Sequence, residues 1–580
     1  MPIILAGIGI ILTLPSLGIG LLFDDYVQRE LILGKYHKSP EIPSIYGMFT
    51  MLDGNPVRTK AIMDAGDIPW WTYLGLRSTF LRPITELTHG LDYQLWPNAP
   101  WLMHLQSLLW FGAIIWIITL LYRRIIKVKW IAGLAAFLFA IDRAHGMPVA
   151  WIANRNVLLC MFFGGLTLLA HDKWRKDGWQ PGAILGPLSL ALGLLAGEAS
   201  LAVAAYLIAY LLFIDQDKIK SRIIGILPYA VIIIIWGISY HLLGYGTYGM
   251  GAYLDPSRET SAFIRAIIER APILLLGQFA EPPPDLYGAD VYKLFPHGEL
   301  IIWLVAVLVL VIISLILLPL FKKDNVVRFW TVGMLLSIIP VCATFPSNRL
   351  LFFVSIGAFG IIAQFFAAWL DTPKSNLPRK SITTKSMGIV AIFFIIIHLI
   401  LSPIVLPINT VSFALYHKVY ISDPALSMPF DEKIKNKTVV ILNPPSAFWG
   451  MMATKVRDYY QQPNPARIYA LASGILPLTL TRIDNQTFDI ENNLGLMQLT
   501  FDQVLRGPSQ PMHVGEQIVL PGMTVEVRAI ADGWQPATAR FKFPVPLDNP
   551  EVLLLVWKNG KYVPYTPPAI GESELLPKIR

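Results

Sequence analysis

Cysteine and charge are both scarce in this sequence. Only two cysteines occur in 580 residues, Cys160 and Cys342. Both lie inside apolar runs, so neither is placed to staple an exported domain. Charged residues make up 15% of the chain, against about 25% in typical soluble domains. Hydrophobic residues reach 54%, and the mean hydropathy is +0.53. These values exclude soluble, disordered, collagenous and disulfide-scaffold proteins, and they are typical of an integral membrane protein.

Long apolar runs of about 20 residues predict transmembrane helices. We identify eleven such segments, at about 3–22, 101–121, 130–142, 149–170, 182–196, 199–214, 222–243, 300–321, 327–345, 349–370 and 387–409. The third and fifth are short, and we assign them because the segments that follow must return across the membrane. The first has no basic start and no clear small-residue cleavage site, so we assign it as a helix and not as a signal peptide. The predicted fold class is an α-helical polytopic membrane protein.

Lysine and arginine gather in alternate short loops, which sets the predicted orientation. The basic loops are 122–129, 171–181, 215–222, 322–328 and 371–386. This pattern predicts a cytoplasmic N-terminus and an extracytoplasmic tail, as in a bacterial inner-membrane protein with a periplasmic domain. The net charge of +8 is then a topology signal, and we predict no nucleic-acid partner.

The predicted domains are a transmembrane domain over 1–410, with large outer loops at 23–100 and 244–299, and an extracytoplasmic β-rich domain over 411–580. Short apolar runs in the tail alternate with turn signals. Asn559-Gly560 between two such runs predicts a hairpin. We expect a sandwich-like domain with a helical piece near 446–461. Expressed alone from about residue 430, it is expected to unfold cooperatively.

The first outer loop is rich in tryptophan. Trp70, Trp71 and Trp96 suit a layer lying on the membrane surface or, equally, ordinary interfacial anchors.

An acidic pair, Asp24 and Asp25, directly follows the first apolar segment. Such a pair either ends a helix or supplies a general base or a metal ligand. One carboxylate can take a proton from an acceptor hydroxyl while its neighbour raises its pKa. We expect the pair in an extended stretch, where adjacent side chains point to opposite sides. One Asp would then do chemistry and the other would be structural.

Other polar residues lie at the same level of the predicted helices. They are Arg82, His104, His145, Asn154, Arg155, Glu198 and Arg349. Snorkelling explains Arg82 and Arg349 equally well, and a core hydrogen bond explains His104. Their convergence on the outer leaflet favours function, because arginine offers phosphate a fork of donors. Carboxylates beside phosphate-binding arginines suggest transfer from a lipid-phosphate donor whose tail lies in an apolar groove.

Several segments, in order, resemble integral-membrane glycosyltransferases of the GT-C type, in particular the protein O-mannosyltransferases and the transmembrane, tetratricopeptide-containing mannosyltransferases. The segments are Asp24-Asp25, FLRPITELTHGLDYQLWPNAPWLMHLQSLLW (80–110), HGMPVAWIANRNVLL (145–159), LLAGEASLAV (194–203) and SNRLLFFVSIGAFG (347–360). The sequence departs from the family pattern in having Gly197 before Glu198 and Asn348 before Arg349. It also has a shortened His-Pro motif at 145–148 and no tetratricopeptide repeats.

The resemblance implies inverting transfer of a sugar from a polyprenyl-phosphate donor to an extracytoplasmic protein or glycan. Asp24 or Asp25 would be the base. Arg349, Arg82 and Arg155 would hold the phosphate. The site would be lined by His145, His104, Glu198 and Asn154. The resemblance implies no metal and no cofactor, and the partners would be the donor, membrane lipids and the acceptor.

Two alternatives remain open at this point. A non-catalytic scaffold on the same fold would be a subunit of a larger membrane complex. A transporter would show paired, broken helices in two related halves, and no such internal symmetry is evident in the sequence.

Overall fold

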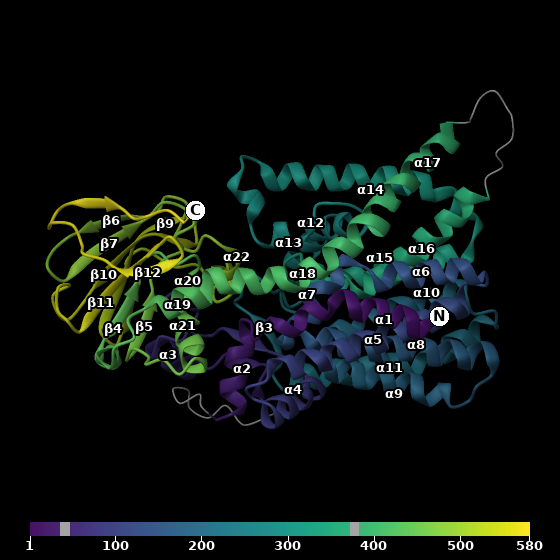
Figure 1. The fold of residues 1–580 in the computed structure, drawn as a ribbon, viewed down its shortest axis with the longest axis horizontal. Coiled ribbons are helices and arrows are strands. Elements are labelled where there is room, and N and C mark those ends of the chain that lie inside the picture. Colours follow the sequence, from purple (N-terminus) through teal and green to yellow (C-terminus); the bar gives the residue numbers. More distant parts are fainter. Residues whose placement is uncertain (35–46, 372–381, 580) are drawn as a thin grey trace. The chain divides into compact units, whose positions relative to one another are not determined.

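The computed structural model describes residues 1–34, 47–371 and 382–579, which form two compact units (Figure 1). The helical unit comprises Met1–Leu21, Phe80–Tyr245 and Glu259–Phe413. The mixed unit comprises Leu22–Thr79, Gly246–Arg258 and Ala414–Arg580. Most of the predicted basic loop 371–386 lies outside the described residues.

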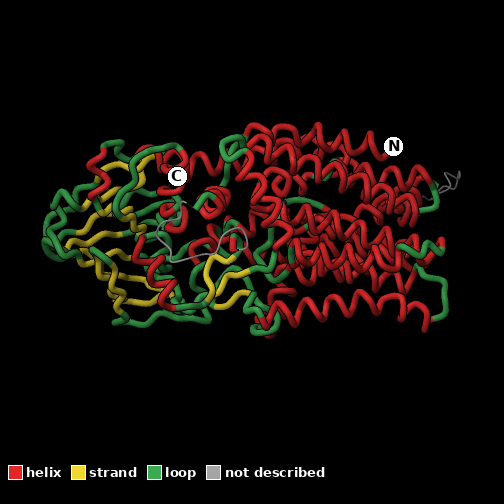
Figure 2. Tube along the Cα trace, turned by 90° about the horizontal axis from the view of Figure 1, so that it is seen from below, coloured by secondary structure: helices red, strands yellow, loops and turns green. Residues whose placement is uncertain are grey.

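The helical unit consists of helices that run roughly alongside one another (Figure 2). They are α1 (Pro2–Thr13), α4 (Pro83–Leu95), α5 (Pro100–Ile125), α6 (Lys129–Ala140), α7 (Gly146–Ala150), α8 (Arg155–Asp177), α9 (Gly182–Ala196), α10 (Val203–Phe213), α11 (Ile219–Leu242), α12 (Thr260–Phe279), α13 (Asp285–Gly288), α14 (Gly298–Lys323), α15 (Asn325–Val341) and α16 (Phe352–Leu370). A last run of helix contains α17 (Ile382–Phe394), α18 (Ser402–His417) and α19 (Asp423–Ser427), with π-helical turns at Ile395–Leu401 and Lys418–Ser422.

Each of the eleven predicted apolar segments coincides with helix. Within the described residues, six helical segments are long and apolar enough to cross a membrane. They are Pro100–Ile125, Ile152–Asp177, Ile219–Leu242, Gly298–Lys323, Phe352–Leu370 and Lys385–Ser427. Four shorter apolar helices accompany them, at Pro2–Gly18, Gly182–Ala196, Glu198–Phe213 and Asn325–Val341. This is the pattern of an integral membrane protein.

The predicted outer loop 244–299 contains a long helix that sequence reasoning missed. Helix α12 carries Arg265, Glu269 and Arg270 within its first eleven residues, and these charges interrupt the apolar run. Its second half packs Ile273 and Leu276 against α14. A helix of mixed character is invisible to a search for uniformly apolar segments.

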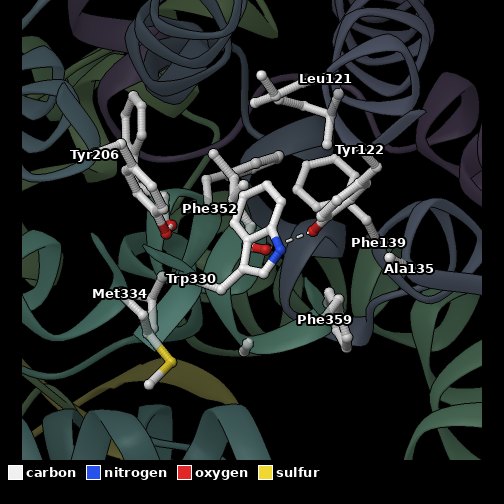
Figure 3. Packing of buried hydrophobic residues seen from close by; sticks show 14 of the residues in the cluster. Leu121, Tyr122, Ala135, Phe139, Tyr206, Trp330, Met334, Phe352 and Phe359 are labelled. Carbon is white, nitrogen blue, oxygen red and sulfur yellow. Dashed lines mark hydrogen bonds between the residues drawn. The ribbon is translucent and has the colours of Figure 1, made fainter. Parts of the chain in front are cut away.

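The core of the helical unit centres on Trp330 of α15, which is fully buried (Figure 3). Tyr122, Phe139 and Phe352 surround it, and the Tyr122 hydroxyl donates to the Ile356 carbonyl (2.6 Å). Glycines allow the helices to come this close. A Cβ on Gly360 would lie 2.6 Å from the Trp330 ring. Small residues at a helix contact let backbones approach closely.

At one end of this unit, basic loop residues are paired with acids. Arg124 contacts Asp172 and Asp177, and Arg175 contacts Asp215 (2.8 Å) and Asp217 (2.7 Å). We call this the paired basic end. These loops were predicted to be cytoplasmic.

The mixed unit holds the strands of the described residues together with several short helices. Its helices are α2 (Asp24–Ile32), α3 (Pro56–Ala65), α20 (Ala447–Met451), α21 (Ala453–Tyr459) and α22 (Thr500–Gln503), besides α19. Its strands are β1 (Thr50–Asp53), β2 (Arg77–Thr79), β3 (Gly246–Tyr248), β4 (Thr438–Ile441), β5 (Arg467–Ala470), β6 (Thr479–Arg482), β7 (Thr487–Glu491), β8 (Gln517–Leu520), β9 (Met523–Ala531), β10 (Gln535–Lys542), β11 (Val552–Lys558), β12 (Lys561–Pro564) and β13 (Ser573–Leu575).

The strands form three sheets. The largest is antiparallel with order β13-β6-β7-β10-β9-β8. A four-stranded sheet, β12-β11-β4-β5, pairs β4 in parallel with both β5 and β11. The third is β1-β2-β3. The predicted hairpin at Asn559-Gly560 joins β11 to β12, and both residues have the positive φ (51° and 78°) that a two-residue hairpin turn favours. The predicted helical piece near 446–461 corresponds to α20 and α21.

The tail does not make this core by itself. Trp70 and Trp71 are buried, at 2% and 0% exposure, in one cluster with residues of β6, β7, β9 and β10. Their ring nitrogens donate to the carbonyls of Leu471 (2.9 Å) and Asp502 (3.1 Å). The predicted surface layer and the alternative of interfacial anchors are therefore both wrong for Trp70 and Trp71, because these side chains complete the core of the mixed unit. The compact units also divide the chain differently from the predicted boundary near residue 410.

Candidate active site

The predicted site residues fall in both units. Asp24 and Asp25 belong to the mixed unit, whereas Arg82, Arg155 and Arg349 belong to the helical unit. We call Leu22–Tyr26 the acidic turn.

The acidic turn opens helix α2. Asp24 and Asp25 form the first turn of this helix, so the extended stretch predicted for them is wrong. The Asp25 side chain is fully buried, and its Oδ2 accepts from the Leu22 amide (2.8 Å). Asp24 is half-buried. Both carboxylates sit at a helix N-terminus, where the helix dipole stabilises negative charge. Asp25 is thus committed to holding the turn, and Asp24 is the more accessible carboxylate.

The far end of α2 is anchored by a buried charge cluster. Lys455 of α21 lies 3.3 Å from Glu30 and 3.2 Å from Asp67. Burial raises the pKa of Glu30 to about 7; Lys455 opposes this rise and nearby Asp458 adds to it. Two carboxylates therefore share one ammonium, and this contact fixes α2 against α21.

In the helical unit, Arg82 and Glu198 form an ion pair. Arg82 Nε donates to Glu198 Oε2 (2.9 Å), and Tyr240 donates to the other carboxylate oxygen (3.2 Å). The Arg82 guanidinium also lies 4.4 Å from the Phe80 ring centroid. Burial lowers the pKa of Arg82, but the Glu198 carboxylate outweighs it, and the net pKa is raised. Both side chains keep some exposure, at 17% and 25%.

Arg155 forms a second pair, which is fully buried. Its guanidinium contacts Asp92 of α4, and neither side chain is exposed. It also donates to Ser107 Oγ (3.2 Å) and the Met103 carbonyl (2.8 Å). Burial raises the pKa of Asp92, and Arg155 opposes that rise. With each nitrogen of its guanidinium bonded to protein, Arg155 ties α4 to α5 and α8. This geometry favours an internal structural role for Arg155 over contact with phosphate.

Arg349 lies beside aromatic rings. Its guanidinium carbon is 5.2 Å from the Phe345 ring centroid and 5.9 Å from that of Trp151. Asp285 lies in the same cluster, where it accepts from Ser347 Oγ (2.7 Å) and the Asn348 amide (3.2 Å). Burial raises the pKa of Asp285, while these two bonds and the Arg349 charge lower it.

The remaining predicted residues are buried. His145 is fully buried and stacks on Phe352 at 4.1 Å, and its Nε2 lies 3.2 Å from Ser355 Oγ. His104 donates to the Gly20 carbonyl (2.8 Å), as the core-hydrogen-bond alternative requires. Asn154 is 4% exposed, and its Nδ2 has no hydrogen-bond partner among the described residues.

The structure adds partners that sequence reasoning missed. Asp92 contacts Arg155 and Trp151 lies beside Arg349. The charge of Arg349 also acts on Asp285 and lowers its pKa. Asp92 lies within the segment 80–110 and Trp151 within 145–159, so the motifs contained both residues without marking them. Asp285 follows a run of three prolines, which carries no comparable signal.

Within the described ranges, no three His, Cys, Asp or Glu side chains gather as a metal ion would require. A cavity of about 520 Å³ opens in the mixed unit. It is lined by Val419, Asp423, Leu426, Ser427, Asn559, Gly560 and Lys561. No predicted site residue lines it.

No protein-family model matches the sequence, and no curated protein matches it. Among solved structures, the chain is similar to the oligosaccharyltransferase of Archaeoglobus fulgidus tethered to an acceptor peptide, with 12% identity and a TM-score of 0.35 over 81% of this chain. It is also similar to AglB of that organism with an inhibitory peptide and a dolichol-phosphate, with 11% identity and a TM-score of 0.38 over 80% of this chain. The chain spans 64% of the length of each. Scores this low do not by themselves define a shared fold.

Proposed function

We propose that the chain is a GT-C-type membrane glycosyltransferase that moves a sugar from a polyprenyl-phosphate donor to an extracytoplasmic protein or glycan. The observation that carries this proposal is the acidic turn. One carboxylate, Asp25, fixes a helix N-terminus, while its neighbour Asp24 remains partly accessible directly after the first apolar segment. Asp25 holds the turn, and the half-buried Asp24 is the carboxylate that we assign as the base.

In the proposed reaction, an acceptor hydroxyl oxygen attacks the anomeric carbon of the donor sugar. Asp24 takes the hydroxyl proton. The bond between the anomeric carbon and the phosphate oxygen breaks, and polyprenyl phosphate leaves with inversion at the sugar. Arg349 binds the leaving phosphate, and Arg82, held by Glu198, supplies a second positive charge for it. Asn154 supplies a buried amide donor. We assign Arg155 and His145 a structural role in packing the helices around these groups. No metal or cofactor takes part.

The proposed location is a bacterial inner membrane, with the N-terminus cytoplasmic and the mixed unit periplasmic. This orientation follows from the basic loops of the paired basic end. The donor, membrane lipids and the acceptor would be the partners of the chain.

The test is transfer from a polyprenyl-phosphate sugar to candidate acceptors in liposomes. Asp24→Asn should lower the transfer rate about 10²–10⁴-fold, the usual contribution of a general base. Asp25→Asn should cost less in rate and more in stability. Arg349→Ala should weaken donor binding, because a charge-assisted hydrogen bond is lost. Asp489→Asn, which alters a partly exposed ion pair of the mixed unit, is the matched control. Full activity of Asp24→Asn would refute the assignment of Asp24 as the base, and full activity of both Asp24→Asn and Asp25→Asn would refute general-base catalysis by the acidic turn.

The alternative is a non-catalytic scaffold subunit of a larger membrane complex. A specific observation favours it: Arg82 and Arg155 are already paired with carboxylates of the protein. A scaffold would turn over no donor and would co-purify in fixed ratio with other membrane subunits.

A further inference from the structure

His417, at the end of α18, lies between two residues of the acidic turn. Its ring stacks on that of Tyr26, with centroids 5.4 Å apart and planes 10° apart. It meets the Phe23 ring edge-on at 4.9 Å. Phe23 and Tyr26 flank Asp24 and Asp25 in the sequence. His417, more than 390 positions away along the chain, therefore contacts the residue before the acidic pair and the residue after it. We call these two ring contacts the aromatic clamp.

The two ring nitrogens of His417 differ in their hydrogen bonding. Nδ1 lies 3.1 Å from Ser422 Oγ, five residues along the chain. In an α-helix, positions five apart face different directions, but the π-helical turn Lys418–Ser422 brings them together. Nε2 has no hydrogen-bond partner among the described residues, although the side chain is only 3% exposed. A buried unpaired polar atom is costly, and in a native protein such an atom calls for an explanation.

The backbone of the acidic turn is strained at the point that His417 contacts. Phe23 has φ 42° and ψ −114°, a region that non-glycine residues avoid. Such a conformation costs of order 1–3 kcal/mol and persists only where surrounding structure holds it. The next two residues are the carboxylates. The amide of Asp25 donates to the Leu22 carbonyl (2.8 Å), which closes the turn over Phe23.

We propose that His417 is a positioning residue of the acidic turn. Its ring holds Phe23 in the strained conformation and fixes Tyr26, and together these contacts set the direction in which Asp24 points. The Ser422 bond fixes the plane of the imidazole. The proposal rests on the proposed function for its catalytic consequence, but the positioning itself is a structural property that can be measured without turnover.

The experiment uses the full-length protein in nanodiscs with three variants: His417→Ala, His417→Phe and Ser422→Ala. Hydrogen exchange of a peptide covering residues 20–26 should speed up about tenfold or more in His417→Ala, because the turn opens locally. Exchange in β9 and β10 should not change. His417→Phe keeps the stacked ring and should restore most of the protection. Ser422→Ala should have an intermediate effect.

The kinetic arm measures kcat and KM separately. His417→Ala should lower kcat about 10–100-fold with an unchanged KM for donor, as expected when a reacting group is misplaced by about 1 Å. His417→Phe should recover most of that loss. Unchanged exchange in His417→Ala would overturn the positioning role. An equal loss in His417→Phe and His417→Ala would overturn the aromatic clamp.

The two proposals fail in different ways. Faster exchange in His417→Ala together with a wild-type protein that transfers no sugar refutes the proposed function and supports the positioning role. Turnover by the wild type with an unaltered kcat in His417→Ala supports the function and refutes the catalytic consequence of the positioning role.

Discussion

Lipid and water impose different rules on the two units. In the helical unit, only 17% of the most apolar stretch of α11, and of α14, is buried inside the protein. Side chains that face lipid do not need to be buried by other protein side chains. In the mixed unit, the apolar faces of the strands must be covered by protein. Trp70 and Trp71 provide that cover from a segment that reads, in sequence, as an outer loop. A helix that faces lipid can therefore lie at the edge of its unit without losing stability. In the mixed unit, by contrast, every segment that buries the strands is needed for folding.

The largest expected effect is the loss of folding in an isolated tail. Residues 430–580 alone lack Trp70, Trp71 and the apolar side chains around them, so the sheet core would face water. Loss of one buried Trp side chain typically costs about 3–5 kcal/mol, and a domain's whole stability is about 5–15 kcal/mol. We therefore expect no cooperative melt by circular dichroism, contrary to the expectation from sequence alone.

Restoring the cover should restore folding. A fusion of residues 47–79 to the tail through a flexible linker is expected to gain a cooperative transition, and the same fusion carrying Trp71→Ala should lose most of it. A tail that melts cooperatively without residues 47–79 would show that the strands close their own core.

The second effect compares a buried ion pair of the helical unit with a surface pair of the mixed unit. Arg155→Met leaves Asp92 buried without its counter-charge and should lower the free energy of unfolding by about 3–5 kcal/mol. Arg540→Met breaks the half-exposed Arg540–Asp489 pair and should cost less than about 1 kcal/mol. Denaturant unfolding in detergent measures both.

A double variant sharpens this comparison. Asp92→Leu combined with Arg155→Met removes both charges and should recover much of the loss. If Arg155→Met leaves the free energy of unfolding unchanged but weakens donor binding, then Arg155 binds the donor phosphate.

The third and smallest effect is a pH dependence in the mixed unit. Glu30 in the unfolded chain loses its proton near pH 4.5, whereas the folded unit holds it until about pH 7. The free energy of unfolding should therefore fall as pH rises through this window, by at most about 3 kcal/mol, and change no further above it. Thermal melts at pH 5 and pH 8 should show this decline in the wild type and not in Glu30→Gln. Glu491→Gln, at an exposed strand end, is the control and should behave as wild type.

Local signals in the sequence predicted much of this fold and only part of the site. Apolar runs predicted the long helices because a helix that crosses lipid needs apolar side chains along its whole length. Asn559-Gly560 predicted its hairpin because the turn requires positive φ. Helix α12 was missed because Arg265 and Glu269 break its apolar run. The pairing of Arg155 with Asp92 could not be foreseen, because 63 positions separate them and only the packed helices choose the partner. The His417 clamp is more distant still.

The glycines of α15 and α16 have a mechanical consequence. A Cβ at Gly357 would lie 2.5 Å from the Trp330 carbonyl, and one at Gly333 would lie 2.4 Å from the Tyr206 ring. Sliding either helix by one turn, about 5.4 Å, would carry larger side chains into these gaps, and close-packed interiors do not deform continuously. We therefore expect helices α10, α15 and α16 to move together, and we expect any opening of the helical unit to occur between other helices.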